Sequence, residues 1–240
     1  MGDHMEKHVK EFNADQFKRL FTVSDLHGQI DQLKAALEAV NFNEDEDLLV
    51  LHADFIDRGD KSIQAFHLIN KKWVVATRGN HEQLAVDGSF DSYLARQHIN
   101  NGGEWFYKYD EDSRYIVARE LEALPVVLEV TFKGKKYGFV HADVVGNDWD
   151  AFKQLVREHP NSRIEPNNIL WAALNNRDRF NSYFKHGNED AIEYVNGVDQ
   201  VYLGHNVVHS HQKLHNVNYI DTGAYRSDKG GYLTLLELGV

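Results

Sequence analysis

Five short polar segments, spread along the chain, carry residue types that bind metal ions or transfer protons. The first is Ser24-Asp25-Leu26-His27-Gly28, in which a carboxylate and an imidazole stand two residues apart. In extended chain, side chains at this spacing point to the same side, so Asp25 and His27 could share one metal ion. Taken alone this pattern is weak, because a surface loop explains it about as well.

The second segment, Asp54-Phe55-Ile56-Asp57-Arg58-Gly59-Asp60, holds three acidic residues and an arginine. A carboxylate has two oxygens and can bridge two cations, and metal ions about 3.5–4 Å apart are the usual arrangement in two-metal phosphatases. The alternative for this segment alone is a charged loop that caps the next helix, and the two explanations are about equally good.

The remaining three segments add ligand types that complete such a site. In Arg78-Gly79-Asn80-His81-Glu82, an amide oxygen could bind a hard metal ion, and the adjacent imidazole could donate a proton. The segments His141-Ala142-Asp143 and Gly204-His205-Asn206 each follow an apolar stretch. A single histidine after a strand is more often structural than a ligand, so these two are informative only in combination with the others.

Each polar segment follows a predicted β-strand. Residues 19–24, 48–52 and 73–77 are apolar runs typical of buried strands, and residues 29–40 and 63–69 have apolar residues at helical spacing. This alternation, followed by helix-like sequence after His81, predicts a right-handed parallel βαβαβ unit. Later elements are predicted as a hairpin at 126–132 and 136–141, a helix at 151–157, and strands at 201–203, 219–220 and 232–238.

The carboxyl ends of strands in an open α/β sheet are where ligands bind. Because the five polar segments all follow strands, we expect them to face one pocket. Without a Pro/Gly/Ser-rich linker, the 240 residues predict a single domain at 16–240. Residues 1–15 are expected to be an N-terminal extension that starts with a cloning remnant.

Composition excludes several classes of protein. The absence of cysteine excludes disulfides, zinc–thiolate sites and a cysteine nucleophile, and it agrees with a reducing cytoplasm. A formal net charge of −11 argues against broad nucleic-acid binding. No apolar run is long enough for a membrane helix, and the start of the chain does not resemble a secretory signal. We therefore expect a cytoplasmic monomer with no nucleic-acid or membrane partner.

Taken together and in order, the five segments resemble the motifs of the PPP-type serine/threonine protein phosphatases, which are calcineurin-like metallophosphoesterases, in their phage and bacterial branch. The resemblance extends from about Gln16 to Leu238. It also includes Gly102-Gly103-Glu104-Trp105-Phe106, Glu122-Ala123-Leu124-Pro125 and Tyr219-Ile220-Asp221-Thr222-Gly223-Ala224. It implies an α/β sandwich of two mixed β-sheets flanked by helices.

The resemblance also implies a role for each candidate site residue. Two divalent metal ions, best suited by Mn²⁺ with Fe or Zn²⁺ as alternatives, would be held by Asp25, His27, Asp54, Asn80, His141 and His205. Asp54 would bridge the two ions. His81 would be the general acid, hydrogen-bonded to Asp57. Arg58 and Arg177 would bind the phosphate, and Arg179 is the nearest competitor of Arg177 because the spacing from Trp171 differs from the family pattern.

The activity implied is the removal of phosphate from phosphoserine and phosphothreonine proteins or peptides, with some phosphotyrosine activity, by direct attack of a hydroxide held by the metal ions. The alternative is a dinucleoside polyphosphate hydrolase, which resembles the same family. A non-catalytic protein that keeps the fold as a scaffold is a third reading. The presence of every expected ligand type and of His81 argues against it.

Two departures from the family pattern concern the backbone. Ser24 and Ala53 stand where the family usually has glycine. If either glycine served an unusual backbone torsion, the adjacent Asp25 or Asp54 would shift. The other histidines singled out are expected to be structural: His52, His98, His159, His186, His209, His211 and His215.

Overall fold

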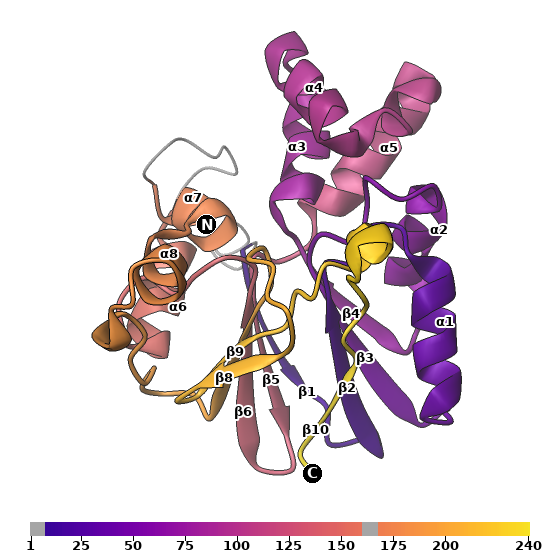
Figure 1. The fold of residues 1–240 in the computed structure, drawn as a ribbon. Helices are drawn as coiled ribbons and strands as arrows, with labels where there is room; N and C mark the ends of the chain where they lie inside the picture. The colour runs from indigo at the N-terminus through magenta and orange to yellow at the C-terminus, as the bar shows by residue number, and fades with distance from the viewer. Residues whose placement is uncertain (1–7, 160–167) are drawn as a thin grey trace.

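Two β-sheets face each other and carry helices on their outer sides (Figure 1). The computed structural model describes residues 8–159 and 168–240, so the predicted cloning remnant lies outside the described residues. One sheet has the strand order β1-β5-β6-β7-β9-β8 and the other has the order β10-β2-β3-β4. Both contain parallel and antiparallel pairs, which confirms the expected sandwich of two mixed sheets.

The four-stranded sheet contains the predicted crossover unit. Its parallel strands are β2 (Arg19–Ser24), β3 (Asp47–His52) and β4 (Val74–Thr77). They are connected by α1 (Ile30–Ala39) and by α2 (Ser62–Phe66), which a 3₁₀ turn at His67–Asn70 extends. The antiparallel β10 (Leu236–Leu238) is shorter than the strand predicted at 232–238.

The six-stranded sheet includes two strands that the sequence did not predict, at residues 9–13 and 212–214. Its members are β1 (Val9–Asn13), β5 (Val127–Phe132), β6 (Lys135–Val140), β7 (Gln200–Leu203), β8 (Gln212–Leu214) and β9 (Val217–Tyr219). β1 pairs in parallel with β5, so residues 9–13 belong to the sheet and are not an extension outside it. As an edge strand, β1 leaves Lys10 and Glu11 exposed, which explains why it lacks an apolar run.

The predicted hairpin joins β5 and β6 by a two-residue turn. Lys133 and Gly134 have φ angles of 50° and 74°. Positive φ at both central residues is the type I′ geometry that matches the twist of an antiparallel pair.

Successive apolar side chains along a strand point to opposite faces of the sheet and so contribute to separate apolar cores. In β3, Leu48 and Val50 pack between the two sheets, whereas Leu49 and Leu51 face the helices outside. A third core lies on the outer face of the six-stranded sheet. It is covered by α6 (Trp149–Arg157), α7 (Ile169–Asn175) and α8 (Asp178–Phe184). Both faces of each sheet are thereby covered, which fixes the sheets against each other.

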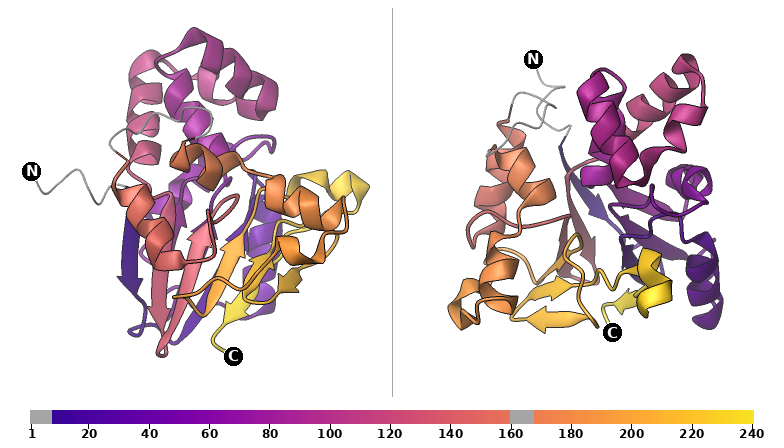
Figure 2. Two further views of the ribbon diagram at one scale, coloured as in Figure 1. Left: turned by 90° about the vertical axis from the view of Figure 1, so that its left-hand side faces the viewer. Right: turned by 45° about the horizontal axis from the view of Figure 1, so that its top comes forward.

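A helical projection follows β4 and extends beyond one end of the sheets (Figures 1 and 2). It consists of α3 (Asn80–Gly88), α4 (Ser92–His98) and α5 (Glu111–Glu122). Shorter helical turns lie at Ile99–Gly103, Phe106–Lys108, Glu189–Ala191 and Ala224–Lys229. Within the described residues, no helix combines the length and apolarity needed to cross a membrane.

Candidate active site

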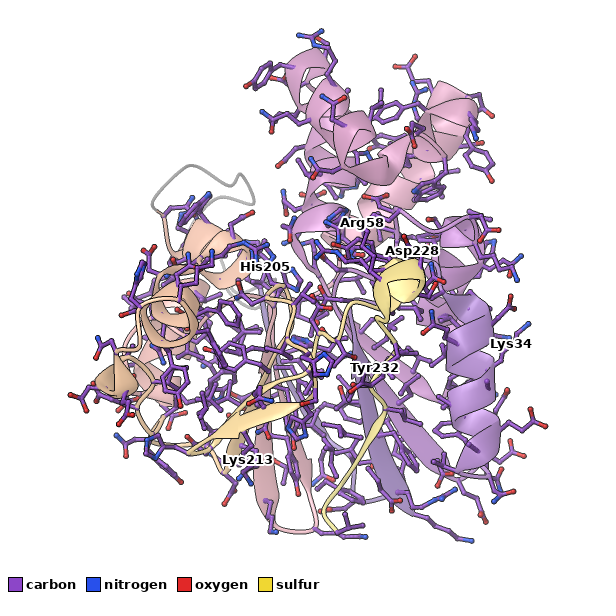
Figure 3. All side chains as sticks on the ribbon, in the orientation of Figure 1. Lys34, Arg58, His205, Lys213, Asp228 and Tyr232 are labelled. Atoms are coloured by element: carbon purple, nitrogen blue, oxygen red, sulfur yellow. The ribbon has the colours of Figure 1, made fainter. Side chains whose placement is uncertain are left out.

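The candidate residues come from the connections that follow β2, β3, β4, β6 and β7. Figure 3 shows Arg58, which follows β3, and His205, which follows β7, at the same end of the two sheets. The strands on which these connections depend belong to different sheets, so neither sheet alone could form the site. A cavity of about 320 Å³ opens at this end.

Asp54 lies at the centre of the cluster. Its Oδ2 atom is 3.1 Å from His141 Nε2, and it is 3.9 Å from both His27 Nε2 and His81 Nε2. Its Oδ1 atom accepts a 3.0 Å hydrogen bond from the backbone N–H of His81. One carboxylate therefore lies between imidazoles supplied by three separate segments of the chain.

Backbone carbonyls fix the orientation of two of these histidines. His27 Nδ1 lies 2.9 Å from the carbonyl oxygen of Ile56, and His205 Nε2 lies 3.2 Å from that of Asn175. Donation to these carbonyls leaves His27 Nε2 and His205 Nδ1 as lone-pair donors. Burial is the main cause that lowers the pKa of both His27 and His205, so both rings are neutral and able to bind a metal ion.

The donor atoms fit divalent cations. Ligand atoms of His27, Asp54 and His81 lie within 4.8 Å of one another, and so do those of Asp54, His141 and His205. Carboxylate and imidazole donors without a thiolate suit Mn²⁺, Fe or Zn²⁺. Asp54 belongs to both groups, as expected of a ligand that two ions would share.

Asn80 lies beside the second of these groups. Its Oδ1 atom is 2.9 Å from His141 Nε2. The amide oxygen and the imidazole nitrogen thus point to the same small volume next to Asp54. This is the placement expected of two ligands to one ion.

Asp25 lines the cavity but is not a member of either three-residue group. Its carboxylate accepts the backbone N–H of His205 at 3.1 Å and contacts the hydroxyl of Ser24. Burial, together with the carboxylates of Asp221 and Asp54, raises the pKa of Asp25. A divalent cation would offset this concentration of negative charge. Asp221 is buried at the same cavity and was not singled out as a site residue from the sequence.

His81 and Asp57 form a buried pair, with 2.8 Å between Nδ1 and Oδ2. Burial lowers the pKa of His81, but the Asp54 and Asp57 carboxylates outweigh it and leave the pKa raised. Burial raises the pKa of Asp57, but its hydrogen bonds with His81 and His98 outweigh that effect and bring the pKa to about 2. His81 Nε2 has no hydrogen-bond partner among the described residues, so it is available to a substrate.

Two further residues form hydrogen bonds with the carboxylate of Asp57. His98 Nε2 lies 2.9 Å and 3.1 Å from the two carboxylate oxygens, and Trp105 Nε1 donates to Oδ1 at 2.7 Å. His98, which was expected to be structural, thus contacts the partner of the candidate general acid. Nothing in the local sequence marks His98, since it comes from α4, far along the chain from both Asp57 and His81.

Glu82 organises the connection after β3. One carboxylate oxygen accepts the N–H groups of Asp54 and Gly79 at 2.9 Å and 2.8 Å. The other accepts those of Phe55 and Ile56 at 2.9 Å and 3.2 Å. The first turn of α3 thereby fixes the backbone that carries Asp54.

Two arginines of the candidate phosphate site line the cavity, and the third arginine does not. Arg58 Nη1 lies 2.7 Å from His27 Nε2. Arg177 contacts the carbonyl of His205 at 3.0 Å and Asn206 Oδ1 at 2.8 Å. Arg179 instead pairs with Asp143 at 3.2 Å and donates to the carbonyls of Val144 and Gly146. The geometry therefore favours Arg177 over Arg179 as the second candidate phosphate-binding arginine.

The sequence model of the calcineurin-like phosphoesterase family matches residues 18–209, which contain all of these segments. This chain belongs to that family. A relative of Salmonella typhimurium, serine/threonine-protein phosphatase 2, is 31% identical over 90% of this chain and 93% of its own length. Serine/threonine-protein phosphatase 1 of the same organism is 30% identical over 97% and 98%.

Other similarities are narrower or concern the fold alone. A symmetrical bis(5'-nucleosyl)-tetraphosphatase of Mannheimia succiniciproducens is 39% identical, but over only 26% of this chain and 23% of its own. The structure of a serine/threonine phosphatase from Saccharomyces cerevisiae has a TM-score of 0.62 and 14% identity. It covers 95% of this chain and 76% of the yeast chain.

The two departures from glycine in this phosphoesterase differ in their consequences. Ser24 ends β2 in ordinary strand conformation, and its hydroxyl lies 3.0 Å from the carbonyl of His52. Ala53 has a φ of 56°, in the left-handed region that favours glycine. The backbone keeps the unusual torsion despite the methyl group, and Asp54 stays at the centre of the cluster.

At two positions of this phosphoesterase, a carboxylate lies so close to the backbone that only glycine fits. A Cβ atom on Gly79 would lie 2.2 Å from Asp54 Oδ1, and one on Gly204 would lie 2.1 Å from Asp25 Oδ2. Any side chain at either position would displace a carboxylate of the site. These contacts explain why the third and fifth polar segments have glycine at these positions.

His52 is buried at the end of β3, where Nδ1 lies 3.0 Å from Thr77 Oγ1, and burial lowers its pKa to about 3. His211 contacts Asn218 Oδ1 at 3.0 Å. Within the described part of the chain, neither belongs to a cluster that could hold a metal ion.

Proposed function

We propose that this protein is a metal-dependent phosphatase that removes phosphate from phosphoserine and phosphothreonine residues of proteins, with some activity on phosphotyrosine. The observation that carries this proposal is the position of Asp54 among the imidazoles of His27, His81, His141 and His205, of which His81 is hydrogen-bonded to Asp57. The two Salmonella relatives, which match most of the chain, are called serine/threonine-protein phosphatases.

Two divalent metal ions, most suitably Mn²⁺, complete the site in this proposal. Their ligands are Asp25, His27, Asp54, Asn80, His141 and His205. When bound, such ions make hydroxide available near neutral pH and neutralise the phosphate oxygens. The hydrogen bonds of His27 and His205 to backbone carbonyls support this assignment, because metal-bound histidines commonly donate their second N–H in this way.

His81 acts as the general acid in this proposal. A serine or threonine alkoxide is a poor leaving group and needs a proton as the phosphorus–oxygen bond breaks. Asp57 accepts the N–H of His81 Nδ1, which leaves Nε2 facing the site as the atom that gives its proton to the leaving oxygen. The raised pKa of His81 favours the protonated form that this step requires.

Arg58 and Arg177 bind the phosphate in this proposal. Arginine's planar fork can donate two parallel hydrogen bonds to a phosphate group. Both guanidinium groups line the same cavity as Asp54 and Asn80, so a phosphate near the metal ligands would meet them. Their role is to orient the phosphorus atom and to stabilise negative charge in the transition state.

Hydrolysis of dinucleoside polyphosphates is the alternative activity. The relatives with that name match about a quarter to a third of the chain, whereas the protein phosphatases match most of it. The direct test compares turnover of a phosphoserine peptide and of diadenosine tetraphosphate by the same Mn²⁺-loaded preparation. We expect a higher kcat/KM for the peptide. A clear preference for the dinucleotide would overturn the proposal.

A further inference from the structure

The rim of the active-site cavity carries two cations that the proposed chemistry does not use. Lys185 and Arg226 line the cavity together with Arg58 and Arg177. Lys185 follows α8, and Arg226 lies in the 3₁₀ segment Ala224–Lys229. The whole chain has a net charge of −11, so the grouping of four cations around one opening runs against its average charge.

Neither rim cation has an acidic partner within the described parts of the chain. Across residues 8–159 and 168–240, no carboxylate lies within ion-pair distance of Lys185 or Arg226, and both side chains are exposed. In contrast, Arg157 pairs with Glu11 at 2.6 Å and Arg179 with Asp143 at 3.2 Å. The two rim cations are exposed and can therefore attract an anion from outside.

A tyrosine holds Arg226 at the rim. The Nε atom of Arg226 donates to the hydroxyl of Tyr225 at 2.6 Å, and its guanidinium lies 4.9 Å from the centre of that ring. The guanidinium of Arg58 lies 4.2 Å from the same ring, which in turn lies 5.0 Å from the ring of His27. Tyr225 thus connects the proposed phosphate-binding arginine to the rim arginine, and the two cations lie on one short path out of the cavity.

The acidic groups near this path do not cancel its charge. Asp25, Asp54 and Asp221 line the cavity but are buried, where the proposed metal ions would neutralise them. Asp228 and Lys229, next to Arg226 in the 3₁₀ segment, are both exposed and carry opposite charges. Positive charge therefore remains at the rim once the site is loaded with metal.

We propose that the rim formed by Arg226 and Lys185 selects phosphorylated segments with an acidic residue next to the phosphorylated one. This inference rests on the proposed phosphatase function. When Arg58 and Arg177 hold the phosphate, the flanking residues of the substrate chain must leave the cavity past its rim. A carboxylate there meets an exposed cation, whereas a neutral residue gains no attraction and a basic residue is repelled. Contacts of this kind act mainly on encounter and on KM, and they weaken with salt.

The test uses three phosphoserine peptides of one length, in which the residues flanking phosphoserine are Asp, Asn or Lys. Asn matches Asp in shape and removes only the charge. We expect kcat/KM to be roughly fivefold higher for the Asp peptide than for the Asn peptide at low salt, and lowest for the Lys peptide. The ratio should approach one at high ionic strength, because the Debye length falls to about 3 Å at 1 M salt.

Matched variants assign the preference to the rim. Arg226→Gln and Lys185→Gln should each reduce the Asp-to-Asn ratio, and the double variant should abolish it. Lys213→Gln is the control, because it removes the same charge near the other end of the six-stranded sheet (Figure 3). We expect the control to keep the ratio of the unmodified protein.

Equal kcat/KM for the Asp and Asn peptides at low salt would overturn the rim proposal and leave the phosphatase function intact. So would a preference that survives in the double variant. Failure to hydrolyse any of the three peptides, together with turnover of diadenosine tetraphosphate, would instead overturn the proposed function itself. The two failures are therefore distinguishable in one set of assays.

Discussion

At the scale of single residues, Asp54 depends on the torsion of its neighbour. Ala53 precedes it with a φ of 56°, and Asp54 itself has a φ of 43°. The left-handed region costs an L-residue with a Cβ roughly 1–2 kcal/mol relative to glycine. The chain therefore tolerates strain at the point where the central carboxylate of the candidate site is attached.

Ala53→Gly should relieve this strain. We expect the free energy of unfolding to rise by up to about 1 kcal/mol, because the gain in the folded state exceeds the added flexibility of glycine in the unfolded chain. Urea denaturation of the metal-free protein measures the change. Ala35→Gly, at an exposed position within α1, is the matched control and should lower stability by about 1 kcal/mol. A loss of stability in Ala53→Gly would show that the torsion is not strained.

His98 is a second residue whose importance is visible only in three dimensions. Its Nε2 atom holds both oxygens of Asp57, which in turn orients His81. His98→Leu should lower kcat on a phosphoserine peptide roughly tenfold, as for other lost contacts that orient a functional side chain. The loss on p-nitrophenyl phosphate should be smaller, because its leaving group needs less protonation.

His98→Gln provides the matched comparison. Its side-chain amide can still donate to Asp57, so it should recover part of the lost activity on the peptide. An equal loss on both substrates, or no recovery with glutamine, would mean that His98 supports the fold and does not act through His81.

The residue types of the candidate site could be read from the sequence, but their surroundings could not. Asp54, His81 and Arg58 stand in recognisable motifs, and the structure brings them together. His98 belongs to no local pattern that distinguishes it from a structural residue, and Asp221 stands in a segment of the resemblance to which no role was assigned. Their contacts depend on how α4 and the segment after β9 pack against the sheet ends, and periodicity in one chain carries no information about that.

At the scale of elements, the first turn of α3 and the connection after β3 form one unit. Glu82 accepts N–H groups from Asp54, Phe55, Ile56 and Gly79. No other carboxylate among the described residues accepts these N–H groups. The first turn of the helix and the loop therefore stabilise each other. A buried carboxylate used in this way acts as a structural anchor for the proposed bridging ligand.

Glu82→Gln should break this unit, because the amide nitrogen cannot accept the N–H groups that it would face. We expect a loss of about 1–3 kcal/mol in the free energy of unfolding. Calorimetric titration should also show weaker Mn²⁺ binding, since Asp54 would lose its fixed position. Glu38→Gln, exposed on α1, makes the same chemical change away from the site and should alter neither quantity. Unchanged Mn²⁺ affinity in Glu82→Gln would contradict this role.

The elements of the crossover unit were predictable because their apolar spacing is regular. The strands at 19–24 and 48–52 and the helix at 29–40 differ from β2, β3 and α1 by at most one residue at either end. β1 was missed because an edge strand needs few apolar side chains. β10 is shorter than predicted because residues 232–235 are apolar in part but do not pair with β2.

At the scale of the whole molecule, two sheets with separate helical layers are needed to assemble one cluster. The connections after β2, β3 and β4 come from the four-stranded sheet, and those after β6 and β7 come from the six-stranded sheet. The core between the sheets, which includes Leu48, Leu128 and Phe139, fixes their spacing. The sequence indicates that such a cluster forms, but only the packed sandwich determines which ligand atoms meet.

The most direct test of this account is turnover of a phosphoserine peptide after the bound metal has been removed exhaustively with EDTA. We predict that activity falls to background and that added Mn²⁺ restores it. We also predict that Mn²⁺ fails to restore activity in Asp54→Asn, which removes the carboxylate shared by the two ligand groups. Undiminished turnover by the metal-free protein would contradict the account.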